Sequence, residues 1–267
     1  MIIIGEKING SIPSMAKAIA EKNGEHIKKL AVAQAEAGAN FIDCCASVDN
    51  EVEVETLKWM VSLIQEATST PIAIDSPNAG ALAELIPFVK KPGLVNSVSG
   101  EGNKIDVIFP AIKGTDWEVV ALLCDDSGIS KTAEQRLKVF ADIMARAKEF
   151  GIDPSRIHID PMVEMLCTSD DGINMIIDVM KEIKRQFPTI HITGAASNIS
   201  FNLPVRKIVN MAFVVLSMAV GLDSAILDPL NQDMMGMIYA TEALLGYDEM
   251  CIEYITAYRQ GIFGQKK

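Results

Sequence analysis

The chain has 267 residues and a formal net charge of -11 at pH 7. Hydrophobic residues make up 49% of the sequence and charged residues 22%, which is typical of a globular protein and excludes a disordered one. The negative charge argues against a nucleic acid as partner, because nucleic-acid binding needs a basic surface.

The cysteines and the apolar segments disfavour further classes of protein. The five cysteines are odd in number and show no CxxC spacing, so they indicate reduced thiols rather than a disulfide framework or a zinc site. The apolar run after Met1 is too short for a signal peptide, and the longest apolar stretch, residues 211–222, is too short to span a bilayer. We therefore expect a soluble, cytoplasmic protein with no membrane partner.

Short apolar runs typical of buried parallel strands alternate with helical periodicity along the chain. The expected strands are residues 2–4, 41–45, 71–75, 94–97, 119–123, 157–160, 190–193 and 224–228. The expected helices are residues 15–21, 26–37, 53–67, 79–89, 105–112, 132–150, 173–187, 207–220, 234–245 and 251–258. The helix over 132–150 carries alternating charge that we place on its outer face.

Eight strand–helix units in about 250 residues favour an α/β fold with a single (β/α)8 TIM barrel. No linker or low-complexity segment divides the chain, so we expect a single domain over residues 1–267. An open sheet stays an alternative, because the sequence does not show whether the first and eighth strands pair.

A polar side chain stands at or after the end of most expected strands. In chain order these residues are Asp43, Asp75, Asn96, Asp125 with Asp126, Asp160, Asn198 and Asp228. The carboxyl ends of barrel strands form one rim, where such folds place active sites. A single Asp there is more often a helix cap, and Asp228 before Pro229 fits that role. Capping accepts Ser and Thr equally well, however, so the repeated Asp and Asn favour a binding site.

The composition of this rim narrows the chemistry. Its carboxylates and amides suit a ligand with several N–H donors and suit a phosphate poorly, since the only cations beside it are Lys7, Lys104 and Arg206. The chain has only three histidines, which leaves little material for a His-based metal site or a Ser-His-Asp triad. No glycine-rich phosphate loop follows a strand. We expect no intrinsic metal.

Six segments, spread over nearly the whole chain, carry a resemblance to a known family. They are IGEKING at 4–10, IDS at 74–76, VNS at 95–97, IDP at 159–161, SNISF at 197–201 and GLDSAI at 221–226. Together they resemble the pterin-binding methyltransferases. This family includes the methyltetrahydrofolate:corrinoid protein methyltransferases, which are similar in length, the folate domain of cobalamin-dependent methionine synthase and, more distantly, dihydropteroate synthase.

The resemblance implies an enzyme of one-carbon metabolism that moves a methyl group between N5 of tetrahydrofolate and the cobalt of a corrinoid protein. The residues that it assigns to binding tetrahydrofolate or methyltetrahydrofolate are Glu6, Asn9, Asp43, Asp75, Asn96, Asp160, Ser197 and Asn198. Asp75, Asn96 and Asp160 are expected at the pterin ring. Asn198 is expected at N5 as the catalytic residue, because an amide can donate or accept and so serves both directions of transfer.

The resemblance also implies a partner and an oligomeric state. A corrinoid protein that carries cobalamin is expected to dock at the carboxyl rim, and the chain is expected to form a homodimer. The segment 211–220 agrees with a dimer, since it is apolar nearly all round, although burial within one chain would cover it as well.

Two positions depart from the family pattern, and three other functions stay open. Cys45 stands where the family often has an amide, and Asp125-Asp126 stands where relatives carry an Asn followed by a basic residue. The alternatives are a dihydropteroate synthase-like enzyme, a (β/α)8 lyase or aldolase, and a folate-binding protein without catalysis. No expected strand ends in the lysine that a Schiff-base aldolase needs.

Overall fold

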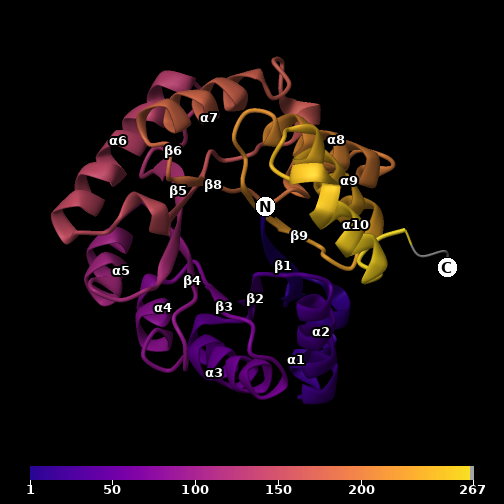
Figure 1. Ribbon diagram of the computed structural model, residues 1–267. Coiled ribbons are helices and arrows are strands. Elements are labelled where there is room, and N and C mark those ends of the chain that lie inside the picture. The colour runs from indigo at the N-terminus through magenta and orange to yellow at the C-terminus, as the bar shows by residue number, and fades with distance from the viewer. Residues whose placement is uncertain (265–267) are drawn as a thin grey trace.

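The computed structural model describes residues 1–264 and shows parallel strands arranged around a central axis, with helices outside them (Figure 1). The residues at the end of the expected domain, 265–267, lie outside the described part. The strands of the barrel are β1 (Ile2–Asn9), β2 (Phe41–Cys45), β3 (Ile72–Asp75), β4 (Leu94–Gly100), β5 (Glu118–Asp125), β7 (Ile157–Asp160), β8 (His191–Ile192) and β9 (Ser224–Leu227).

The sheet closes on itself, which decides between a barrel and an open sheet. Its hydrogen-bonded order is β8-β7-β5-β4-β3-β2-β1-β9, and β1 pairs with β9 in parallel. The two ends of this order are joined just past β8, where the Ile226 amide donates to the Gly194 carbonyl at 3.0 Å and the Ala196 amide donates to the Ile226 carbonyl at 3.1 Å. The expected (β/α)8 barrel is therefore confirmed.

The outer ring consists of helices whose apolar stripes pack on the strands. They are α1 (Pro13–Ala20), α2 (Gly24–Glu36), α3 (Asn50–Ala67), α4 (Ala79–Leu85), α5 (Lys104–Ile112), α6 (Ala133–Phe150), α7 (Asn174–Gln186), α8 (Arg206–Met218), α9 (Gln232–Leu244) and α10 (Ile252–Arg259). Local signals set their ends: the Thr132 side chain caps α6, and Gly151 ends it in the left-handed conformation at φ 70°.

The expected barrel strands and helices are confirmed in their order, and several boundaries differ. β1 continues to Asn9, and β4 continues to Gly100. A short strand that the sequence analysis missed, β6 (Gly128–Ile129), forms an antiparallel hairpin on β5. Two residues are too few to show a period, so this hairpin leaves no pattern in the sequence.

The interior of the barrel is apolar in its middle and polar at its two ends. Side chains from alternate positions form an inner cluster of Ile4, Phe41, Ala73, Leu94 and Val120. At the amino end of the strands, the buried His158 ring contacts Glu118 Oε2 at 2.6 Å and Ser224 Oγ at 2.9 Å. The apolar middle separates this network from the carboxyl end, where the side chains are polar again.

Close contact between β1 and β2 places the end of β1 at the carboxyl rim. The Gly10 amide donates to the Cys45 carbonyl at 2.9 Å. A Cβ at Gly10 would lie 1.9 Å from the Ala46 carbonyl oxygen, so only glycine lets the two strands approach in this way. No helix among the described residues combines the length and apolarity needed to cross a membrane.

Candidate functional site

A cavity of about 710 Å³ opens at the carboxyl ends of the barrel strands. It brings together all eight residues that the sequence analysis singled out: Glu6, Asn9, Asp43, Asp75, Asn96, Asp160, Ser197 and Asn198. They come from β1, β2, β3, β4, β7 and the turn after β8, so residues far apart in the chain share one hollow. Their roles in binding stay predictions, but their proximity is a structural fact.

The floor of the cavity is made by carboxylates and one amide on adjacent strands. The register pairs Asp75 with Asn96 and Leu122 with Asp160, so these side chains stand side by side above the apolar middle. Asp43 is 1% exposed and accepts a long hydrogen bond from Asn96 Nδ2 at 3.5 Å. Few protein donors reach these carboxyl groups, which leaves acceptor capacity for a ligand.

Burial raises the pKa of each floor carboxyl group. The pKa of Asp43 lies well above its usual range because the group is buried and because the charge of Asp75 is close. Burial raises the pKa of Asp75 to about 6. Burial also raises the pKa of Asp160 to about 6, against the opposing effect of the Met162 amide and of the charge of Arg136. A ligand that donates hydrogen bonds would stabilise the ionised forms.

β1 supplies a further carboxyl group and an amide to the cavity. Burial, followed by the charge of Asp228, raises the pKa of Glu6 to about 7. Asn9 lies at the end of the strand, where its side-chain oxygen accepts from the Ser11 amide at 2.9 Å. An irregular register between Gly5 and Ile8 lets β1 turn both side chains towards the cavity.

The turn that carries Ser197 and Asn198 is held from behind by Arg206 of α8. Arg206 donates to the Ser197 carbonyl at 2.7 Å and to Ser200 Oγ at 3.0 Å, and its guanidinium stacks over Phe201 at 4.5 Å. None of the hydrogen bonds within residues 1–264 uses the Asn198 side chain. The amide of Asn198 is therefore positioned at the cavity and free to bind a ligand.

Three acidic residues expected at the rim do not line this cavity. Asp125 and Asp126 line a separate pocket with residues of α5 and α6, because β5 runs on into the hairpin with β6. Asp125 accepts from the Ser127 amide at 2.9 Å, as in an Asx turn. Asp228 accepts from the Leu230 amide at 2.9 Å and pairs with Lys7 at 3.3 Å. All three still lie at or directly after the carboxyl ends of β5 and β9, as expected, but outside the cavity.

The sequence analysis missed residues that complete the cavity. Ser76, Ser97 and Leu122 lie among its walls. The cations Lys104 and Arg206, which were expected beside the rim, line it as well. Lys104 is held by Glu101 at 2.7 Å. The positions of both serines, directly after Asp75 and Asn96, were a signal that could have found them. Within residues 1–264, no three His, Cys, Asp or Glu side chains are grouped in a way that could hold a metal ion.

Residues 8–228 match the model of a family described as pterin binding enzyme. This match spans most of the chain and includes the cavity residues from Asn9 to Ile226, but not Glu6. The chain belongs to the pterin-binding enzyme family.

Relatives within the pterin-binding enzymes differ in how much of their length the chain covers. Methylcorrinoid:tetrahydrofolate methyltransferase of Eubacterium limosum is 50% identical over 266 residues, which are 99% of this chain and 98% of the relative. Methionine synthase of Mycobacterium tuberculosis is 26% identical over 240 residues, which are 85% of this chain and 20% of that enzyme. The chain thus matches only a fifth of the methionine synthase.

Solved structures of pterin-binding enzymes share the fold. Dihydropteroate synthase from Clostridium difficile, solved with pteroic acid, has a TM-score of 0.70 at 21% identity, covering 91% of this chain and 96% of that one. The synthase from Xanthomonas albilineans, in complex with 7,8-dihydropteroate, has a TM-score of 0.69 at 15% identity, covering 93% of both chains. At these identities the likeness shows the fold alone.

Cys45 is one of the two positions where a departure from the family pattern was expected from the sequence. Its Sγ lies 3.3 Å from Ser47 Oγ, and the residue is buried beside Asp75. Burial, with the charge of Asp75, raises the pKa of Cys45 to about 12, so the thiol stays neutral. A neutral thiol is only a weak hydrogen-bond donor, so it supplies less to Asp75 or to a ligand than an amide would.

The raised pKa of Asp43 predicts a stabilising substitution. A carboxyl group whose folded-state pKa is raised weakens the folded state as the pH rises above about 4, the pKa in the unfolded chain. We expect Asp43→Asn to increase the free energy of unfolding at pH 8, with a smaller gain at pH 5, where less of the stabilising ionisation occurs in the unfolded chain.

Urea unfolding at the two pH values checks this prediction. Asp125→Asn is the matched control, because Asp125 is only half-buried and hydrogen bonds from Ser127 lower its pKa, so its removal should bring no gain. A variant Asp43→Asn that is no more stable than the wild type at pH 8 would contradict the account of the cavity floor.

Proposed function

We propose that the chain is a methyltransferase that moves a methyl group between N5 of tetrahydrofolate and the cobalt of a corrinoid carried by a partner protein. The observation that carries the proposal is the cavity floor, in which buried carboxyl groups at the carboxyl end of a barrel have few protein donors. The relative from Eubacterium limosum, named for this reaction and 50% identical, supports the same conclusion. We also propose that residues 1–267 act as a single barrel domain.

The floor residues suit the pyrimidine edge of a pterin. That edge presents ring N–H groups and an exocyclic amine, which Asp75 and Asp160 would accept from as carboxylates. Asn96 would both donate and accept beside them. Asp43 lies one layer deeper, bonded to Asn96, and would keep that amide oriented. Substrate binding would then lower the raised pKa values of these carboxyl groups.

Asn198 would lie at N5 of the folate, where charge changes during the reaction. A tertiary amine is a poor leaving group until N5 gains positive character, so a hydrogen bond to N5 should strengthen towards the transition state. The amide of Asn198 can donate to N5 in one direction of transfer and accept from a protonated N5 in the other. Glu6, with its pKa of about 7, stands beside the same turn and would hold a proton close to it. The corrinoid of the partner supplies the cobalt that exchanges the methyl group with N5.

A dihydropteroate synthase-like reaction is the second candidate. It is favoured by Lys104 and Arg206, the two cations that line the cavity, because that chemistry has a pyrophosphate leaving group. Both cations are engaged, however: Lys104 pairs with Glu101, and Arg206 holds the turn after β8. Methyl transfer is therefore the better fit to the cavity.

Mixing the protein with methyltetrahydrofolate and a reduced corrinoid protein tests the proposal. We expect the absorption spectrum of methylcobalt to appear only when the protein is present. Tight folate binding without methyl transfer to any corrinoid acceptor would favour a folate-binding protein. Turnover of a pterin pyrophosphate instead would favour the second candidate.

The substitution Asn198→Ala separates catalysis from binding. Because Asn198 is placed where charge develops, we expect the single-turnover rate at saturating folate to fall by roughly 10- to 1000-fold, the range for losing one charge-stabilising group. Folate affinity should fall by a smaller factor. Asp160→Ala serves as the contrasting variant, since its loss should weaken binding by about 1–3 kcal/mol and change the saturated rate less. A wild-type rate for Asn198→Ala at saturation would place the chemistry elsewhere.

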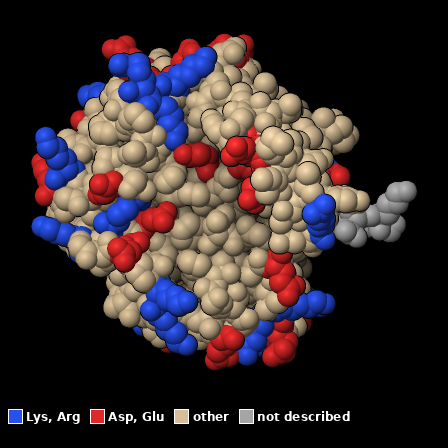
Figure 2. Space-filling model, in the orientation of Figure 1, with Lys and Arg blue, Asp and Glu red and all other residues tan. Residues whose placement is uncertain are grey.

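We further propose that the corrinoid protein docks at the carboxyl rim and that the chain is a homodimer. The cavity opens at that rim, and methyl transfer needs the cobalt there. For the dimer, α8 carries an outer apolar stripe in which Ile208 is 61% and Leu216 54% exposed. The surface over α8–α10 shows few charged side chains (Figure 2), and Leu244 at the end of α9 is 87% exposed. Apolar side chains this exposed, gathered on one face, favour burial of that face against a second chain.

Light scattering at micromolar concentration tests the dimer. The wild type should show the mass of two chains, and Ile208→Glu should shift it towards one chain, because a charge on α8 opposes burial of the stripe. A wild-type mass of a single chain would decide against the dimer and leave the proposed reaction untouched.

A further inference from the structure

Arg136 of α6 is a charged residue that the barrel buries completely. Its exposed fraction is 0%, and it is the largest fully buried side chain among the described residues. The charged side chains of this helix were expected on its outer face, and Arg136 is the exception. An arginine is seldom fully buried unless its N–H groups are paired, so its partners show what it holds.

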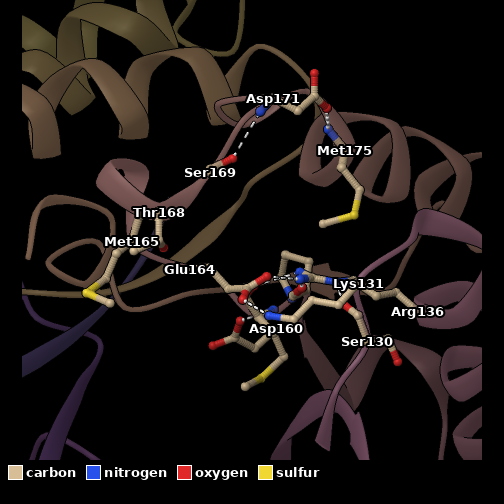
Figure 3. A network of polar contacts seen from close by, with 12 residues as sticks. Ser130, Lys131, Arg136, Asp160, Glu164, Met165, Thr168, Ser169, Asp171 and Met175 are labelled. Atoms are coloured by element: carbon tan, nitrogen blue, oxygen red, sulfur yellow. Dashed lines mark hydrogen bonds and ion pairs between the residues drawn. The ribbon is translucent and has the colours of Figure 1, made fainter.

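The guanidinium of Arg136 joins two connections that are distant in sequence. Nε donates to the Ser130 carbonyl at 2.9 Å, in the segment before α6. Nη1 donates to the Met162 carbonyl at 2.6 Å and also to the Pro161 carbonyl, and Nη2 pairs with Glu164 at 2.7 Å. Figure 3 shows Arg136 and Lys131 converging on Glu164, with Asp160 beside them. All these acceptors beyond Ser130 belong to the connection from β7 to α7.

That connection begins directly after Asp160. The Met162 amide donates to Asp160 Oδ1 at 2.7 Å, while the Met162 carbonyl accepts from Arg136. Met162 has φ 64°, in the left-handed region that residues other than glycine seldom adopt. One strained residue is thus held on both sides, by the carboxyl group of the cavity floor and by the buried guanidinium. Loss of Arg136 would free Met162 to relax, and the amide that orients Asp160 would move with it.

The same connection reaches the turn that carries Asn198. Cys167 Sγ lies 3.5 Å from the Phe201 carbonyl, which accepts from it, and the side-chain amide of Asn202 donates to the sulfur of Met165 at 3.7 Å. A displacement of the backbone at Met162 would therefore affect both Asp160 on one side of the cavity and the turn of Asn198 on the other. Arg136 touches neither the cavity nor the reacting atoms, so any effect that it has must pass through this connection.

The charge of Arg136 acts on Asp160 as well. Burial raises the pKa of Asp160, and Arg136 lowers it. The other titratable or charged groups nearby are Cys124 of β5, Glu164, which pairs with Arg136 itself, and the cations Lys131 and Lys104, which pair with Glu164 and Glu101. Arg136 is the cation whose charge lowers the pKa of Asp160.

We propose that Arg136 is a positioning residue for the folate substrate, which fixes residues 161–164 and thereby presents Asp160 to the cavity as an oriented carboxylate. This inference rests on the proposed function, because it assigns Arg136 a part in binding that substrate. It assigns no chemistry to Arg136.

Methyltetrahydrofolate binding to Arg136→Gln and Arg136→Lys, measured by calorimetry between pH 5 and 8, tests the proposal. We expect Arg136→Gln to weaken binding at pH 7.5 by about 10- to 100-fold, the loss typical of hydrogen bonds to a charged group. Binding to the wild type should weaken as the pH falls through about 6, where Asp160 and Asp75 take up protons. We call this loss of affinity at low pH the acid limb. In Arg136→Gln the acid limb should move to higher pH, since the cation that favours the carboxylate is gone.

Arg136→Lys separates charge from geometry. It keeps the positive charge but not the fork of donors, so binding should weaken by about 3- to 10-fold while the acid limb stays near its wild-type position. Arg146→Gln is the matched control, because Arg146 lies on the same helix and pairs on the surface with Asp106 and Glu149, and it should bind like the wild type. A merely structural role would weaken both Arg136 variants without moving the acid limb of Arg136→Gln.

Affinities of both Arg136 variants within twofold of the wild type would overturn the proposal. If Arg136→Gln does not fold, the affinity of Arg136→Lys decides alone. A wild-type protein that binds no methyltetrahydrofolate would contradict the proposed function instead. In that case amide hydrogen exchange, which needs no ligand, still tests whether Arg136 fixes residues 161–164. Exchange at the Met162 amide should be faster in Arg136→Lys than in the wild type, and an unchanged rate would overturn the proposal.

Discussion

Carboxyl groups buried at the mouth of an apolar barrel are the constraint on which the site depends. Taking an ionised carboxylate out of water is costly unless donors replace the lost hydration. Here Asn96 reaches Asp43 only at 3.5 Å, and the Met162 amide reaches Asp160 at 2.7 Å. The pKa values of Asp43 and Asp160 are raised because these hydrogen bonds do not fully offset the effect of burial. The cavity is therefore completed by a ligand that brings N–H groups, and a pterin carries them along one edge.

Two arginines fix the positions of the connections that carry cavity residues. Neither forms the cavity floor; each holds a connection that bears a floor or rim residue. Arg206 fixes the turn of Ser197 and Asn198 through a carbonyl and a hydroxyl group, and Arg136 fixes the connection that follows Asp160. Guanidinium groups suit this task because their rigid fork of donors satisfies several backbone carbonyls at once. Loops on such anchors can place side chains with the accuracy that catalysis needs.

Much of the fold is readable from the sequence, because a buried parallel strand requires a nearly continuous apolar run. The cavity residues Asp75, Asn96 and Asp160 were likewise predictable, since each ends such a run. The separation of Asp125 from the cavity was not predictable, because the sequence does not reveal that β5 continues into a hairpin with the two-residue strand β6. The burial of Arg136 was equally hidden: its partners Pro161 and Glu164 lie 25 and 28 residues away, and a helical pattern carries no information about them.

Proton release on ligand binding tests the central claim most directly. Calorimetric titration with methyltetrahydrofolate at pH 6.5, in buffers of different ionisation enthalpy, measures the protons exchanged with solvent. Ligand donors should lower the pKa of floor carboxyl groups that stand near 6 in the free protein, so the account predicts net proton release. The release should diminish at pH 8, where these groups are already ionised. Binding at pH 6.5 with no release, or with proton uptake, would contradict the account.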